Sequence, residues 1–292
     1  LEPYGMPPCL ILKRDGSTLY PTRDIAAALG AQKRADQRLV GFALETVNEL
    51  AHALDPTRLT EGCSNVDGDI NFITDIAVLR QNVGWQKGMA DDVAVWCRQL
   101  ASKREWRTAH FSVCYGEEGS VDQQSDEIVR AKRGSLQLPE RRQTQMHEIY
   151  SHHIAEADIF WGVWLDNIFD YGSSRRAYGL NQSGLIGYDH RQKKDAYYLY
   201  RAKWNERATT PHIAEGAWRE RSESLQSVKV YSREEPQVYM NNDTLSVRRH
   251  SEGVWVADSV HMCGEVTIRA YAPSGIGCDS VQIRVGSVRP HR

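Results

Sequence analysis

The spacing of apolar residues changes once along this chain of 292 residues, from a helical period to a period of two. In the first part, apolar residues recur at steps of three and four, as in the series Leu39, Phe42, Ala43, Val47, Leu50 and Leu54. This spacing predicts helices with one face on a core. After about residue 222, apolar and polar residues alternate, which is typical of strands that bury one face. The chain therefore combines an α/β part with an all-β part.

Strand and helix patterns alternate through the first part. The predicted elements are, in order, a helix over 25–54, a strand over 70–78, a helix over 91–103, a strand over 109–113, a helix over 144–155, a strand over 158–165 and a helix over 195–204. Such alternation predicts a parallel sheet covered by helices, here part of a (β/α)8 TIM barrel. The polar stretch 117–145 predicts a long surface loop, which in such barrels borders the site.

The second part has the pattern of a β-sandwich. Its alternating apolar positions are Val228 and Val230, Val238 and Met240, Val254 and Val256, Val266 and Ile268, and then Val281, Ile283 and Val285. The run 241–243 (Asn, Asn, Asp) predicts a hairpin turn, because these residues tolerate positive φ. We therefore predict a partial barrel domain over 1–205, a linker over 206–222 and an immunoglobulin-like β-sandwich over 223–292.

The overall charge and hydropathy exclude several classes of partner. A net charge of −2, a pI near 6.6 and a mean hydropathy of −0.55 give no drive toward nucleic acid or an anionic membrane. The apolar run 159–165 is far too short to span a bilayer. Residues 22–34 resemble the start of a helix-turn-helix, but no recognition helix follows, which favours an ordinary amphipathic helix. We predict neither a nucleic-acid partner nor a membrane span.

The six cysteines lack the spacing of a zinc site or of a dense disulfide framework. Cys263 and Cys278 share the all-β part, and two alternatives stay open for them, a bridge between strands or two free thiols. The first residue is Leu1 rather than Met, so we expect a processed or excised product.

A histidine cluster in the helix over 144–155 contains residue types that bind zinc, namely His147, Glu148, His152 and His153. A metalloprotease helix needs histidines four residues apart, whereas the fourth residue after His147 is Ser151. His152 lies about 140° round the helix from His147. We therefore predict no metal site and no cofactor.

Several co-linear blocks resemble the β-galactosidases of glycoside hydrolase family 2. The longest, over 158–204, places an apolar strand, a glycine-rich polar loop and an aromatic helix in the family's order, and further blocks lie at 51–62, 74–88, 111–121 and 227–247. The resemblance implies the C-terminal part of such an enzyme, with the second half of the catalytic barrel and the immunoglobulin-like domain that follows it. The implied reaction is retaining hydrolysis of terminal β-galactosides.

The same resemblance places the two catalytic carboxylates of the family at positions that hold other residues here. Gln32 occupies the acid/base position and Cys114 the nucleophile position. Retaining hydrolysis needs two carboxyl groups about 5 Å apart, so we expect an inactive or strongly impaired enzyme. Glu117 and Glu118 are candidates to replace the nucleophile if the loop is shifted by one residue. The alternative is a noncatalytic carbohydrate-binding or adhesion module.

A β-galactoside or related carbohydrate is the partner that the resemblance implies. The implied contact residues are Trp85, Tyr115, His147, Trp161, Trp164, Asp166 and Asn167, where Asp166 replaces the family's tryptophan. A partial barrel leaves strand edges open. We therefore expect a homo-oligomer or pairing with a complementary N-terminal fragment. By resemblance alone, a periplasmic or secreted location is favoured over the cytoplasm.

Overall fold

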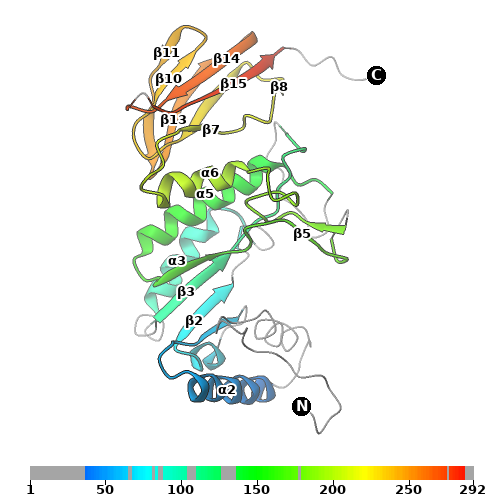
Figure 1. Ribbon diagram of the computed structural model, residues 1–292, viewed down its shortest axis with the longest axis vertical. Coiled ribbons are helices and arrows are strands. Elements are labelled where there is room, and N and C mark those ends of the chain that lie inside the picture. Colours follow the sequence, from blue (N-terminus) through cyan, green and yellow to red (C-terminus); the bar gives the residue numbers. More distant parts are fainter. Residues whose placement is uncertain are drawn as a thin grey trace. The chain divides into compact units, whose positions relative to one another are not determined.

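The structure is a computed structural model that describes residues 37–64, 68–80, 83–84, 88–103, 110–125, 136–176, 179–274 and 276–286 (Figure 1). The chain forms two compact units. The first comprises residues 1–81, 98–115 and 157–164, and the second comprises 82–97, 116–156 and 165–292. The domain boundaries predicted at 205 and 223 stay predictions.

The first unit is built on a four-stranded sheet with the order β1-β2-β3-β4. Its strands are β1 (Glu61–Ser64), β2 (Ile76–Arg80), β3 (His110–Tyr115) and β4 (Gly162–Leu165). β1 and β3 both pair in parallel with β2, which confirms the parallel sheet that the alternation of elements predicts. Closure into a TIM barrel stays a prediction.

Two helices of the first part of the chain agree with the predicted ranges. The described residues of the first predicted helix form α2 (Gln37–Leu54), and α3 (Asp92–Ser102) matches the second. The predicted core face of α2 is wrong at three positions, because Phe42, Leu50 and Leu54 are 68%, 46% and 59% exposed. A helical period identifies an apolar face but does not say what covers it.

The strand predicted over 70–78 begins later than expected. Residues Asp69–Phe72 form a short 3-10 helix, η2, and the strand starts at Ile76. The backbone N–H and side-chain amide of Asn71 both donate to the Gly68 carbonyl, at 3.1 and 2.9 Å. Such local hydrogen bonds of Asn compete with strand pairing, so the apolar residues around Asn71 did not extend the strand.

The second unit contains two helices that are joined by a small hairpin segment. They are α5 (Glu140–Ala157) and α6 (Asp195–Trp204), with the strand pair β5 (Tyr171–Gly172) and β6 (Leu180–Asn181) between them. α5 begins four residues before the predicted start at Thr144. Its first turn buries polar side chains, including Glu140 and Gln143, so an apolar period could not reveal it.

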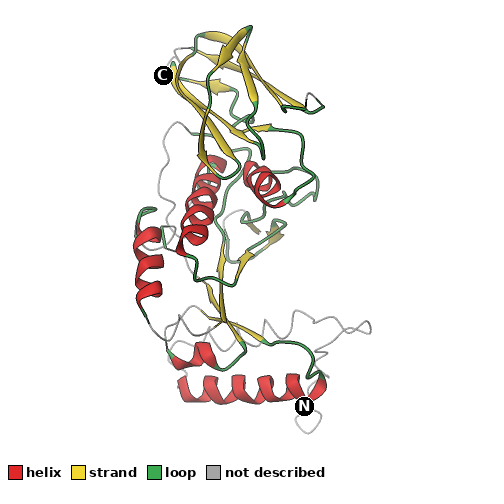
Figure 2. Cartoon of the chain, turned by 90° about the vertical axis from the view of Figure 1, so that its left-hand side faces the viewer, coloured by secondary structure: helices red, strands yellow, loops and turns green. Residues whose placement is uncertain are grey.

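Two β-sheets pack face to face in the rest of the second unit (Figure 2). One has the order β11-β10-β14-β15-β8 and the other β12-β13-β9-β7. The strands are β7 (His212–Ile213), β8 (Glu220–Arg221), β9 (Leu225–Tyr231), β10 (Gln237–Met240), β11 (Asp243–Leu245), β12 (Arg248–Ser251), β13 (Val254–His261), β14 (Gly264–Tyr271) and β15 (Cys278–Val285). The period-two pattern missed β7, β8 and β12, which are short.

The sandwich core consists of the predicted inward residues for the most part. It includes Val228, Val230, Val238, Val266, Ile268, Ile283 and Val285. The predicted turn is confirmed, since Asn241 has a φ of 55° and Met240 pairs with Asp243. Cys263 and Cys278 are free and exposed. The immunoglobulin-like strand order stays a prediction.

The outer face of the second sheet packs on the two helices. Tyr231 and Val254 share a buried cluster with Leu199 of α6. Lys229 Nζ lies 2.8 Å from each carboxylate oxygen of Glu148 on α5, and the Tyr231 hydroxyl donates to the same carboxylate. The stretch 206–222, predicted as a linker, contributes β7 and β8 to the sheets.

None of the helices in the described ranges has the length and apolar character that crossing a bilayer requires.

Candidate functional site

The segments that follow β3 and β4 come together through their backbones in the second unit. A Cβ atom at Gly116 would lie 1.9 Å from the Asp166 carbonyl oxygen, so only glycine permits this approach. Gly184 is equally confined, with the Asp170 backbone nitrogen 2.2 Å from the place of its missing Cβ. Three loops, 116–120, 165–170 and 181–186, therefore form one compact polar region, which we call the strand-end site.

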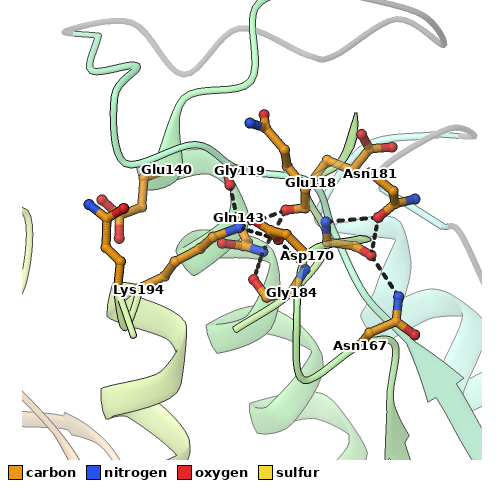
Figure 3. Close-up of polar contacts among 12 residues, drawn as sticks. Glu118, Gly119, Glu140, Gln143, Asn167, Asp170, Asn181, Gly184 and Lys194 are labelled. Carbon is orange, nitrogen blue, oxygen red and sulfur yellow. Dashed lines mark hydrogen bonds and ion pairs between the residues drawn. The ribbon is translucent and has the colours of Figure 1, made fainter. Parts of the chain in front are cut away.

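A buried lysine connects these loops. Lys194 is 2% exposed and immediately precedes α6. Its Nζ donates to Asp170 Oδ1 at 2.8 Å, to the Gly119 carbonyl at 2.7 Å and to the Gln182 carbonyl at 2.9 Å (Figure 3). An ammonium group has three N–H donors, and each one has an acceptor here. Burial lowers the pKa of Lys194, while the charge and hydrogen bond of Asp170 oppose this shift.

Amide side chains complete the same region. Gln143 of α5 donates from Nε2 to the Glu117 carbonyl at 2.8 Å and to the Gly184 carbonyl at 3.1 Å (Figure 3). Asn181 Oδ1 accepts hydrogen bonds from the backbone N–H and the hydroxyl of Ser183, at 3.0 and 2.6 Å. Buried polar groups need such partners. The hydrogen bonds of Gln143 join two of the loops, whereas those of Asn181 stay within the loop 181–186.

The two glutamates after β3 lie inside this region rather than at its surface. Glu117 is 1% exposed, with its Oε2 3.7 Å from Arg142 Nε. Glu118 is 5% exposed, with its Oε1 3.0 Å from Arg176 Nη2. Burial raises the pKa of Glu117 well above its usual range and also raises that of Glu118, and the arginines only partly oppose these shifts.

The strand-end site therefore lacks an exposed carboxylate pair. The carboxylates in its loops are those of Glu117, Glu118, Asp166 and Asp170, and all four are less than a tenth exposed. Burial raises the pKa of Asp170, while the charge of Lys194 lowers it. The neighbouring Asn167 donates from Nδ2 to Ser183 Oγ at 3.2 Å. A retaining glycosidase needs one carboxylate that attacks the sugar and one acid that protonates the leaving group.

Cys114 and Tyr115 are the last two residues of β3 in the first unit. Their side chains are 5% and 3% exposed. Trp161 lies at the opposite end of that strand, because its ring contacts that of His110, the first residue of β3, in a tilted arrangement with the ring centroids 5.0 Å apart. Cys114 is four positions further along the strand than His110, which corresponds to roughly 13 Å. The structure thus does not bring Trp161 together with the position implied for the nucleophile.

The remaining predicted contact residues differ in their exposure. Trp164 of β4 is 52% exposed, so its indole is open to a ligand. His147 is buried in α5, with Nδ1 2.9 Å from the Tyr200 hydroxyl. Burial, with a smaller effect of Lys194, lowers the pKa of His147 to about 3, so this imidazole is neutral. Gln32 and Trp85 lie outside the described residues.

Sequence reasoning missed the residues that organise the site, namely Lys194, Gln143, Arg142 and Arg176. One signal was available. The helix over 144–155 has few apolar positions, and a helix with a thin apolar stripe must bury polar groups if it packs in a core.

Most of the chain is similar to known glycosidases. It is 29% identical over 238 residues to a β-glucuronidase of Bacteroides fragilis, a match that covers 79% of this chain and 34% of that protein. The crystal structure of a candidate β-galactosidase from Bacteroides fragilis covers 88% of this chain and 40% of its own, with a TM-score of 0.79 and 23% identity. The chain spans about a third of the length of the curated relative. It is therefore a relative of the glycosidases in the broad sense and has their fold in this region.

Two shorter similarities point elsewhere. Residues 12–61 match the C-terminal domain of the DNA/pantothenate metabolism flavoproteins. A stretch of 29 residues is 76% identical to the arginine–tRNA ligase of Alkaliphilus metalliredigens, which is 10% of this chain and 5% of that enzyme. Neither covers enough of the chain to define its family.

Proposed function

We propose that this chain is a family 2 type β-glycosidase relative in which hydrolysis is absent or strongly reduced. The observation that carries the proposal is Cys114, a buried thiol at the end of β3 where the resemblance implies the nucleophilic carboxylate. The acid/base assignment to Gln32 adds little weight, because it falls within the stretch 12–61 that also matches a flavoprotein domain.

The chemistry of a thiol supports this proposal. A retaining enzyme forms a covalent glycosyl intermediate that water must then hydrolyse. A thiolate can attack a sugar, but the resulting thioglycosyl intermediate releases its sulfur slowly when water attacks, so the second step would be slow. Cys114 is also shielded, with 5% of its surface exposed.

Replacement of the nucleophile by a neighbouring glutamate is not favoured by the geometry. Glu117 would have to leave Arg142, and Glu118 would have to leave Arg176. Both glutamates are almost fully buried, and burial raises the pKa of Glu117 well above its usual range and also that of Glu118, which disfavours the carboxylate form that a nucleophile requires. These carboxylates support the loops of the strand-end site.

An assay with chromogenic glycosides tests the proposal. We expect the chain to hydrolyse nitrophenyl β-galactoside and nitrophenyl β-glucuronide no faster than buffer, because Cys114 cannot complete a turnover. Cys114→Ser should behave identically. Turnover by the unmodified chain that is lost in Glu117→Gln or Glu118→Gln would overturn the proposal, since it would show that a loop glutamate is the nucleophile.

A second candidate function is carbohydrate binding without hydrolysis, favoured by the exposed indole of Trp164. Aromatic faces pack against the apolar faces of sugars. Calorimetric titration with galactose and glucuronate oligosaccharides should show binding to the unmodified chain, and Trp164→Ala should remove this binding. Trp204→Ala is the matched control, because Trp204 is 55% exposed on α6. Equal binding by both variants would exclude a role of Trp164.

A further inference from the structure

The last two turns of α5 present three metal-ligand side chains together on the surface. These are His152, His153 and Glu156, whose ligand atoms all lie within 4.8 Å of one another. His152 Nε2 is 3.4 Å from Glu156 Oε1, and His153 Nδ1 is 3.3 Å from Glu156 Oε2. The two imidazole rings are 5.0 Å apart.

Helical spacing explains this convergence. Glu156 is four residues after His152 and three after His153, and residues at both spacings are neighbours on a helix surface. One carboxylate therefore reaches both imidazoles, with one oxygen toward each. Glu148, one turn earlier, cannot take this role because its carboxylate binds Lys229 and Tyr231.

The ligand set and its place suit a divalent transition metal. Imidazole nitrogens and a carboxylate oxygen are typical zinc ligands, and three protein ligands leave a position for water. The side chains of His152, His153 and Glu156 are 45%, 26% and 61% exposed, so solvent can complete the coordination. α5 ends at Ala157, and the negative end of a helix dipole favours a cation.

We propose that His152, His153 and Glu156 form a surface site for one divalent transition-metal ion of the zinc or nickel type. His147 does not belong to this site, since its imidazole lies against Tyr200. Glu156 supplies the third ligand in its place. The site lies outside the strand-end site and does not depend on the proposed function.

Calorimetric titration with zinc tests this site on the whole chain without a histidine tag. The protein is first treated with EDTA and then alkylated with iodoacetamide, because the exposed cysteines Cys63, Cys263 and Cys278 would also bind zinc. We expect one ion per chain. His152→Ala and His153→Ala should each weaken binding by about tenfold or more, and Glu156→Gln should weaken it as well.

His261→Ala is the matched control, because His261 is an exposed histidine in β13. This variant should bind zinc as the unmodified chain does. Binding should also weaken as the pH falls, since a metal competes with protons for imidazole. The proposal is overturned if the unmodified chain takes up no zinc at about 100 μM, or if His152→Ala and His153→Ala both keep its affinity.

Discussion

Replacing Lys194 by methionine tests whether the buried ion pair holds the loops of the strand-end site. Methionine is an unbranched side chain one atom shorter than lysine, and it removes the charge and all three donors. Asp170 would then stay buried without its cation, and the carbonyls of Gly119 and Gln182 would each lose a hydrogen bond. All three acceptors belong to different loops, so the change reaches the whole site.

The expected loss of stability follows from this geometry. Removing one partner of a buried ion pair costs about 3–5 kcal/mol, because the other charge is left uncompensated. Lys194 is 2% exposed and Asp170 is 6% exposed, so the full range applies. Lys193→Met is the matched control. Lys193 is the preceding residue and is exposed over the Tyr197 ring, and surface changes of this kind are usually within about 0.5 kcal/mol.

Urea unfolding, followed by tryptophan fluorescence and circular dichroism, measures the difference. Lys194→Met combined with Asp170→Asn should recover part of the loss, because no uncompensated charge remains. The deficit of Lys194→Met should also shrink as the pH falls from about 7 to 5. Lys194 lowers the pKa of Asp170 in the intact pair, so without it the folded-state pKa rises further and protonation removes the buried charge. A midpoint for Lys194→Met equal to that of Lys193→Met would refute the reasoning.

Three further predictions concern pH, backbone approach and assembly. Burial and the charge of Asp195 raise the pKa of Glu140 from 4.5 to about 7, so its contribution to the free energy of unfolding is fully present below about pH 4.5 and is lost as the pH rises through about 7. The urea midpoint of Glu140→Gln should therefore depend less on pH in this window than that of the unmodified chain. An equal pH dependence of the two midpoints would show that Glu140 does not cause it. Gly184→Ala should destabilise the chain far more than Gly172→Ala in thermal unfolding, because a Cβ at Gly172 meets nothing within 4 Å, and equal melting temperatures would contradict the close approach. β1 and β4 are the outer strands of their sheet in the described part of the chain, so we expect self-association or pairing with a complementary fragment; a monomer by light scattering whose β4 amides exchange as fast as loops would argue against both.

The sandwich strands could be predicted from the sequence because the evidence for them is local. A strand that buries one face needs apolar residues at every second position, and Val228 and Val230 satisfy this rule within one strand. The turn at Asn241 is likewise encoded by its own residue, which adopts a φ of 55°. Where local hydrogen bonds compete with strand pairing, as at Asn71, the same rules misplace the start of a strand.

The strand-end site could not be predicted in this way because its partners are far apart in the chain. Lys194 bonds to residues 12, 24 and 75 positions away, and no periodicity connects them. Gln143 reaches acceptors 26 and 41 positions away. A sequence pattern identifies polar residues, but only the packing of α5 and α6 decides which of them are buried.

The burial of the strand-end carboxylates also determines how far activity could be restored. Cys114→Glu would return an acid to the nucleophile position, but that position is only 5% exposed. Burial raises the pKa of a carboxyl group, as it does at Glu117 three residues further on. A protonated acid cannot attack a sugar, so we expect Cys114→Glu to show at most weak hydrolysis of nitrophenyl β-galactoside, increasing with pH as the carboxyl ionises. A rate comparable to that of an ordinary glycosidase at pH 6 would contradict this expectation. It would show that residue 114 is solvated and that the absence of a carboxylate at this position is by itself the cause of the lost hydrolysis.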